Sequence, residues 1–152
     1  MKVRSANKFD LPYYLNLVHK VHKEGLIGSY DVPLDDEYLN VLLNTVLHGG
    51  GLALVIENDN ETIGMIMGII TPNIWSHTTL VLHQILFFVD EEYRNTRAGH
   101  MLISEYNEKC HELVEQKRIG YHTLSATKTM FEIDFSRFGY DCIEKTWVSN
   151  GV

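Results

Sequence analysis

The chain has 152 residues, of which 45% are hydrophobic and 22% charged, and its formal net charge is −7 with the histidines counted as neutral. This length suits one compact domain over residues 1–152, and the acidic balance argues against a nucleic-acid partner, which would need a clustered basic surface. The sequence contains neither an apolar run of membrane-spanning length nor the apolar core of a signal peptide, so we expect a cytoplasmic protein with no membrane partner.

The chain begins with strand and helix patterns. Lys2–Ser5 alternates like a short strand. Asp10, placed before a leucine and a proline, has the position of a helix N-cap, and apolar residues at helical spacing carry that helix from Leu11 to just before Gly25. A second helix is expected to begin at Asp35 or Asp36, either of which could cap it, and to run to about His48.

The next residues predict a β-hairpin. Leu52–Glu57 and Thr62–Ile70 are rich in β-branched and apolar residues, and they flank the polar turn 58–61. We expect these two strands to be antiparallel. Residues 71–79 carry no clear pattern and are expected to form a looser connection.

From Leu80 onwards the sequence predicts a strand, a loop, a helix and a second strand. Leu80–Val89 is almost continuously apolar, as in a strand covered on both faces. A long helix follows from Ala98 to about Lys117 with a glycine stop at Gly120, and Tyr121–Ala126 completes a right-handed β-α-β crossover. Residues 130–138 suit another helix and residues 141–148 a last strand.

The loop between Val89 and the long helix has the composition of a phosphate-binding site. The first amides of a helix have no intrahelical partner, and the helix dipole adds partial positive charge at that end. Arg94 and Arg97 would add planar, permanently charged donors, and Gly99 would allow a ligand to approach the backbone.

The pattern Val-x-x-x-x-Arg-x-x-x-x-Gly over Val89–Gly99 resembles the acetyl-CoA motif of the GCN5-related N-acetyltransferases (GNATs). The usual loop reads R/Q-x-x-G-x-G/A, whereas Arg97 replaces the first motif glycine here. The resemblance covers nearly the whole chain through the element order β-α-α-β-β-β-α-β-α-β. It implies an α/β fold in which a mixed sheet of six or seven strands is flanked by about four helices. It also implies acetyl-CoA as cosubstrate and a possible homodimer, and the residues it assigns to the cofactor are Arg94, Asn95, Thr96, Arg97, Ala98, Gly99 and His100.

In this resemblance an amine attacks the acetyl thioester directly, and main-chain N–H groups at Phe87, Phe88 and Val89 stabilise the developing oxyanion. His83 is our candidate general base because a free imidazole titrates near neutral pH, although a histidine in an apolar strand is also a common core residue. The neighbouring Gln84 could orient a water.

The general acid of the family does not transfer to this sequence. The segment 135–140 resembles the family ending Y-x-x-x-G-F, but Phe135 stands where many members have a tyrosine and has no proton to give. Tyr140 is our candidate acid, with Tyr93, His122 or solvent as alternatives.

Other candidate residues remain open. Tyr30 and Trp75 could wall the acceptor site, or they could cap the core or an oligomer interface. Cys110 and Cys142 have neither a disulfide framework nor metal-ligand spacing, and we predict no metal site.

The predicted function is transfer of an acetyl group from acetyl-CoA to a primary amine of a small molecule or a protein. The alternative is a CoA-binding or protein-interaction module on the same fold that has lost its chemistry. Phe135 and Arg97 favour this alternative, because both replace residues of the usual motifs.

Overall fold

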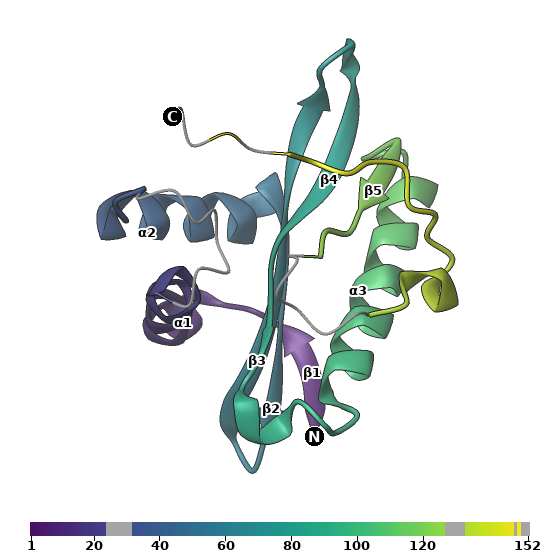
Figure 1. The fold of residues 1–152 in the computed structure, drawn as a ribbon. Helices are drawn as coiled ribbons and strands as arrows, with labels where there is room; N and C mark the ends of the chain where they lie inside the picture. Colours follow the sequence, from purple (N-terminus) through teal and green to yellow (C-terminus); the bar gives the residue numbers. More distant parts are fainter. Residues whose placement is uncertain (24–31, 127–132, 148, 150–152) are drawn as a thin grey trace.

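The computed structural model describes residues 1–23, 32–126, 133–147 and 149. The strands of this part of the chain are β1 (Lys2–Ser5), β2 (Gly51–Asn58), β3 (Glu61–Asn73), β4 (Ser76–Val89) and β5 (Tyr121–Thr123), and the α-helices are α1 (Leu11–Lys23), α2 (Asp36–Thr45) and α3 (Ala98–Glu115). The strands form one sheet in the order β1-β2-β3-β4-β5, antiparallel except for the parallel pair β4–β5. Helices α1 and α2 lie on one side of this sheet and α3 on the other (Figure 1). The predicted fold class is confirmed, with five strands in the described residues where we expected six or seven.

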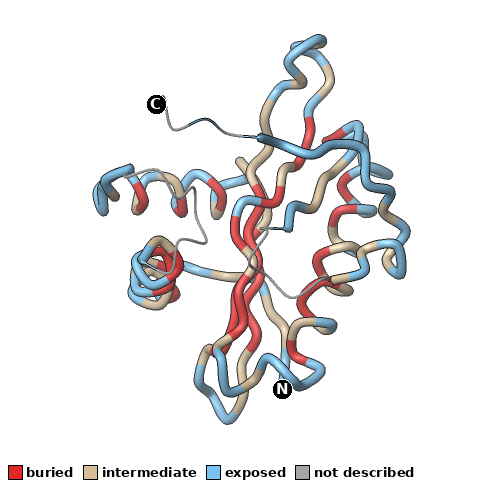
Figure 2. The backbone as a smooth tube through the Cα atoms, viewed as in Figure 1, coloured by how far each residue is buried: buried red, intermediate tan, exposed pale blue. Residues whose placement is uncertain are grey.

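The sheet separates two apolar cores, and buried residues run along its centre and along the helix faces turned towards it (Figure 2). On the side of α1 and α2, Tyr14 and Leu43 pack with Met65 of β3. On the other side, Leu102 and Tyr106 of α3 pack against the sheet. Neither helix layer could bury its apolar face alone, so the sheet is the shared support of both layers.

A glycine lets α3 approach the sheet closely. A Cβ at Gly68 of β3 would lie 2.1 Å from the hydroxyl oxygen of Tyr106, which is far inside van der Waals contact. The Tyr106 hydroxyl is buried and has no hydrogen-bond partner among the described residues. The fold therefore requires a residue without a side chain at this point of β3.

The predicted hairpin between β2 and β3 is confirmed. Asp59 and Asn60 occupy its two-residue turn with φ of 50° and 66°. Asp and Asn tolerate this left-handed conformation better than most residues, and turns of this kind match the twist of paired strands.

The predicted cap of α1 is wrong. Asn7 caps a short 3₁₀ turn (Lys8–Asp10), and Asp10 closes a capping box by accepting a bond from the Asn7 amide at 2.8 Å. Asp10 also forms an ion pair with Arg4 at 2.8 Å. Burial opposes ionisation of Asp10, but the bonds from Arg4 and the Asn7 amide outweigh it and lower the pKa of this carboxyl. Asp10 therefore ties β1 to the start of α1.

Residues 71–79 are not a loose connection. They are the far ends of β3 and β4, which pair from Gly64–Val89 to Asn73–Ser76 and extend beyond the rest of the sheet as a hairpin (Figure 1). Ile74 and Trp75 at its tip are 85% and 90% exposed. With so little burial, this hairpin carries no apolar alternation that could have predicted it.

The end of α3 also differs from the prediction. The helix ends at Glu115, and Lys117 adopts a left-handed conformation with φ of 57°. The amide of Arg118 then bonds to the carbonyl of Leu113 at 2.9 Å, a closure typical of helix C-termini. The glycine stop that we expected at Gly120 is therefore not what ends this helix.

The C-terminal region is less regular than predicted. The strand expected over residues 121–126 ends at Thr123, and residues 141–147 form no strand. Of the helix expected over 130–138, residues 130–132 lie outside the described part, and the described remainder contains only a 3₁₀ turn (Phe135–Phe138). No helix within the described ranges has the length and apolar character needed to cross a membrane.

Candidate functional site

One edge of β4 is only partly paired. Strand β4 meets β5 through Val81–His83 against Tyr121–Thr123. From Gln84 to Val89 it has no strand partner on this side within the residues that the structure describes. In Figure 1, β4 continues past β5 to the end of the sheet where α3 begins. An unpaired strand edge offers main-chain donors and acceptors to a ligand.

A β-bulge lies where this open edge begins. In the ladder with β3, Gln84 is opposite Gly68. The next pair is Leu86 with Met67, so Ile85 is an extra residue in β4. A bulge of this kind re-aims the backbone that follows it and is common next to functional sites.

The groups that face the open edge after the bulge can be assigned from one hydrogen bond. The carbonyl oxygen of Val89 accepts a bond from Nε of Arg94 at 3.0 Å, so it points away from β3. Alternate residues of a strand direct their N–H and C=O groups to the same edge. The main chain of Phe87 therefore faces the open edge with Val89. The main chain of Phe88 faces β3, so the prediction that its N–H lies at the oxyanion is wrong.

The open edge leads to the N-terminus of α3. The first intrahelical bond of α3 runs from the amide of Met101 to the carbonyl of Arg97 at 2.9 Å. The amides of Gly99 and His100 precede this bond and so have no intrahelical partner, which is the usual basis of anion binding at helix N-termini.

Gly99 is not required by the fold. A Cβ at this position would lie 3.6 Å from the Phe87 ring and 3.9 Å from Val89, which is ordinary van der Waals contact. The missing side chain therefore leaves space in front of the helix end that the protein itself does not need.

The two arginines of the loop differ in their surroundings. Arg94 donates to Val89, and its guanidinium carbon lies 4.9 Å from the centre of the Phe88 ring. Arg97 is exposed, and its side chain bonds to none of the residues that the structure describes. Arg94 thus fixes the loop to β4, while Arg97 is available to a ligand.

The other predicted loop residues shape the start of α3. The Thr96 hydroxyl donates to the Tyr93 carbonyl at 2.7 Å and accepts from the Ala98 amide at 3.1 Å. Asn95 and His100 are exposed. Together with the arginines and Gly99 these residues form one continuous segment, made of the loop and the first turn of α3.

His83 and Tyr140 are not brought together. His83 is half-buried, and its Nδ1 is hydrogen-bonded to the Thr123 hydroxyl over 3.0 Å. The Tyr140 hydroxyl is hydrogen-bonded to Nδ1 of His122 over 2.8 Å. Because His122 and Thr123 are neighbours in β5, their side chains point to opposite faces of the sheet. The two predicted catalytic side chains therefore lie on opposite faces.

The surroundings of His122 and Tyr140 disfavour their charged forms. Burial lowers the pKa of His122, and the nearby His111 lowers it further. Burial also raises the pKa of Tyr140, with a contribution from Cys110. This pair is therefore a neutral hydrogen-bonded contact between β5 and the C-terminal segment.

The structure does not bring Trp75 to the other predicted site residues, and Tyr30 lies outside the described residues. Trp75 is at the tip of the β3–β4 hairpin. At the usual rise of a strand it is roughly 25 Å along the chain from His83.

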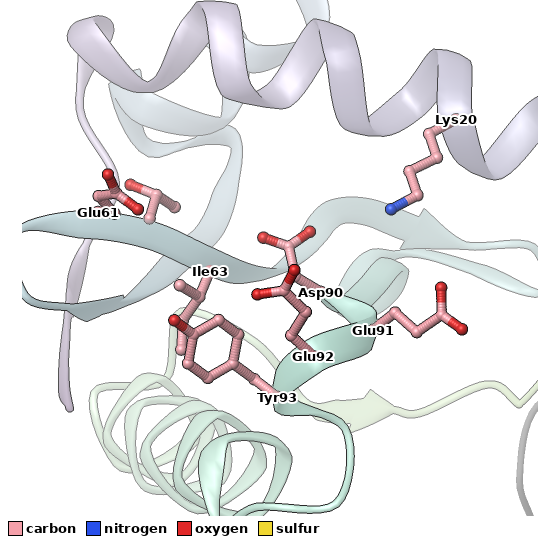
Figure 3. Close-up of a pocket in the computed structure, with 8 residues that line it drawn as sticks. Lys20, Glu61, Ile63, Asp90, Glu91, Glu92 and Tyr93 are labelled. Atoms are coloured by element: carbon pink, nitrogen blue, oxygen red, sulfur yellow. The ribbon is translucent and has the colours of Figure 1, made fainter.

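A hollow of about 410 Å³ lies at the Val89 end of β4. It was not predicted from the sequence. It is lined by Lys20, Glu61, Thr62, Ile63, Asp90, Glu91, Glu92 and Tyr93. In Figure 3, Lys20 extends from α1 towards the consecutive acidic side chains that follow β4. Burial raises the pKa of Asp90, although Lys20 and Arg94 act in the opposite direction. The abrupt change from the apolar strand to three acids is the sequence signal that marks this place.

The Phe88 ring connects this hollow with the loop. Nζ of Lys20 lies 5.1 Å from the centre of the ring, and Arg94 also contacts the ring. Cations are attracted to the faces of aromatic rings. Phe88 therefore links α1 to the turn that begins α3.

Comparison with known proteins agrees with this fold. The family described as "Acetyltransferase (GNAT) domain" matches residues 34–152. No curated protein sequence matches the chain.

Solved structures share the fold at low sequence identity. An aminoglycoside acetyltransferase from an uncultured soil metagenomic sample is 20% identical, with a TM-score of 0.65, over 97% of this chain and 92% of its own. An acetyltransferase from Trypanosoma brucei is 18% identical, with a TM-score of 0.67, over 97% of each chain. A ribosomal-protein-alanine N-acetyltransferase from Brucella melitensis is 13% identical, with a TM-score of 0.63, over 98% of this chain and 99% of its own.

Proposed function

Because the chain belongs to the GNAT acetyltransferase domain family, we propose that it transfers an acetyl group from acetyl-CoA to a primary amine. Family membership supports acyl transfer in general. The observation that carries the finer proposal is the unpaired edge of β4, which leads from Phe87 and Val89 to the free amides at the start of α3.

The residues along this edge suit acetyl-CoA. The amides of Gly99 and His100, together with Arg97, are a donor set for a pyrophosphate, and the missing side chain of Gly99 leaves room for it. Acetyl-CoA, when bound, supplies the thioester carbon that the amine attacks. The N–H of Phe87, held in a strand, would donate to the oxygen that gains negative charge.

His83 is the proposed general base. It lies next to the bulge, and Thr123 holds its ring through Nδ1, which leaves Nε2 to take a proton from the attacking ammonium or from a water. Solvent or Tyr140 would protonate the departing thiolate. Tyr30 remains a proposed substrate contact, and Trp75 is not retained as one because it lies at the exposed tip of the β3–β4 hairpin.

The proposed acceptor is defined only as a primary amine. The relatives named above are an aminoglycoside acetyltransferase and a ribosomal-protein-alanine N-acetyltransferase, so one fold serves both small and protein acceptors. The net charge of −7 favours a cationic acceptor.

Two features favour a second candidate, a CoA-binding module without chemistry. Phe135 lies in the 3₁₀ turn beside α3 and has no hydroxyl, and Arg97 replaces a motif glycine. Loss of a general acid slows an acyl transfer but leaves cofactor binding intact.

Thermal unfolding with acetyl-CoA and a thiol-release assay with a panel of amines test both candidates. We expect acetyl-CoA to raise the melting temperature and free thiol to appear only when an amine is supplied. Stabilisation without thiol release for any amine would support the binding module. If millimolar acetyl-CoA and CoA both leave the melting temperature unchanged, neither candidate survives.

A further inference from the structure

Gln84 is a buried polar residue in an otherwise apolar part of β4. Tyrosines aside, the buried side chains of the described residues that carry nitrogen or oxygen are those of Asp10 and Gln84, and Gln84 is 9% exposed. Asp10 is explained by its ion pair with Arg4. A buried polar side chain costs stability unless it is hydrogen-bonded, so Gln84 needs its own explanation.

The partner of Gln84 is the strand that leaves β4. Its Oε1 accepts a hydrogen bond from the amide of Ser125 at 2.9 Å. The last backbone pair between the two strands is His83 with Thr123. Gln84 and Ser125 are therefore the first groups to meet beyond the paired segment.

This bond replaces a rung of the ladder. In a continuing parallel pair, the Ser125 amide would donate to a main-chain carbonyl of β4 at the usual strand spacing. Oε1 lies farther from its own Cα than a main-chain oxygen does. The side chain of Gln84 therefore satisfies the Ser125 amide while holding the two backbones apart.

The bulge beside Gln84 explains why the separation of the β4 and β5 backbones matters. Ile85 is the extra residue of β4, and from Phe87 onwards the odd-numbered residues face the open edge. If pairing continued past Thr123, the main chain of Phe87 would be covered by the neighbouring strand. A buried amide side chain at position 84 stops pairing immediately before the groups that must stay free.

We propose that Gln84 is a positioning residue that ends β4–β5 pairing through the Ser125 amide and keeps the main chain of Phe87 and Val89 open to the acyl and pantetheine end of acetyl-CoA. This inference rests on the proposed function. It predicts that Gln84 affects only the acyl and pantetheine end of the cofactor. The pyrophosphate end would be held by Arg97 and the start of α3, which Gln84 does not touch.

The test compares binding of two ligands to the intact protein by calorimetry. One is acetyl-CoA, and the other is adenosine 3′-phosphate 5′-diphosphate, which has the phosphates but no pantetheine arm. Gln84→Leu keeps the size of the side chain and removes the acceptor. We expect it to weaken acetyl-CoA binding at least tenfold and to leave binding of the nucleotide unchanged.

Matched variants separate the hydrogen bond from packing. Ser125→Pro removes the amide donor and should reproduce the effect of Gln84→Leu. Gln84→Glu keeps an acceptor and Ser125→Ala keeps the donor, so both should bind acetyl-CoA more tightly than Gln84→Leu. If Gln84→Leu fails to fold, Ser125→Pro carries the comparison.

Hydrogen exchange of the ligand-free protein provides a readout that does not depend on activity. The Phe87 amide should exchange quickly in the wild type and become protected in Gln84→Leu as pairing extends. Equal acetyl-CoA affinity and equal exchange in wild type and Gln84→Leu would overturn the role of Gln84 alone. Absence of acetyl-CoA binding by the wild type would overturn the proposed function, and this inference with it.

Discussion

Arg94 donates a hydrogen bond from Nε to the carbonyl oxygen of Val89 over 3.0 Å, so the loop before α3 is fixed to the last residue of β4. Among the residues that the structure describes, Arg97, three positions later, has no such attachment. The two arginines of the motif are therefore expected to contribute differently.

Removing Arg97 should affect binding alone. In Arg97→Ala, we expect an unchanged melting temperature without ligand and an acetyl-CoA affinity lower by roughly 10- to 100-fold, the effect of losing about 1.5–3 kcal/mol from a charged hydrogen bond. Arg94→Ala should also lose about 1 kcal/mol of folding stability, seen as a melting temperature lower by roughly 2–4 °C. Lys109→Ala, a cation removed from the exposed face of α3, controls for net charge. Equal melting temperatures for the two arginine variants would contradict this division.

A methyl group at Gly99 should weaken acetyl-CoA binding without lowering the stability of the fold. The added Cβ meets only ordinary contacts, and alanine favours a helix over glycine by up to about 1 kcal/mol. We expect Gly99→Ala to be as stable as the wild type or slightly more stable in urea unfolding. Its affinity for acetyl-CoA should fall about tenfold or more, because the methyl group would occupy the space proposed for the pyrophosphate. Unimpaired binding would show that the cofactor does not approach this backbone.

Gly68→Ala should destabilise the fold. Its Cβ would lie 2.1 Å from the Tyr106 hydroxyl, so either β3 or α3 must shift, at a cost of about 3 kcal/mol in the free energy of unfolding. Tyr106→Phe removes a hydroxyl that has no partner in the described structure and should be neutral or stabilising. In the double variant, part of the loss should be recovered, which a double-mutant cycle in urea measures. Additive effects would place the strain somewhere other than this contact.

His83 should matter for turnover and not for cofactor affinity. For a general base we expect His83→Gln to lower kcat by roughly 10²- to 10⁴-fold while the Kd for acetyl-CoA is unchanged. Thr123→Val removes the bond that orients the ring and should give a smaller fall in the same parameter. His77→Gln, an exposed histidine of the same strand, is the control. Normal kcat in His83→Gln would assign the proton transfer to another group.

The parts of the fold that the sequence predicts are those with a burial pattern or a demanding turn. The apolar run that ends at Val89 predicts a covered strand, and Asp59 and Asn60 predict a tight hairpin. Residues 141–148 suit a strand, yet Ile143 and Trp147 are 82% and 88% exposed and residues 141–147 form no ladder. A local pattern yields a strand only where a neighbouring strand is available, and that depends on distant parts of the chain.

The candidate site also has a part that local sequence predicts and a part that it does not. Arg97, Gly99 and the helix start could be identified because they are consecutive. The bonds from Thr123 to His83 and from Ser125 to Gln84 could not, because each joins residues about forty positions apart. The ring contacts of Phe88 with Lys20 and Arg94 depend on how α1 lies on the sheet, which no local pattern specifies.

The short parallel pair between β4 and β5 also has a consequence for the order of folding. Strands β2, β3 and β4 are joined by tight turns, whereas His83 and Thr123 are 40 residues apart. Closing a long loop costs more conformational entropy than closing a turn, and non-local pairings slow folding. Strands β2, β3 and β4 should therefore assemble before β5 docks. Pulse-labelled refolding that protected Thr123 before Met65 would refute this order.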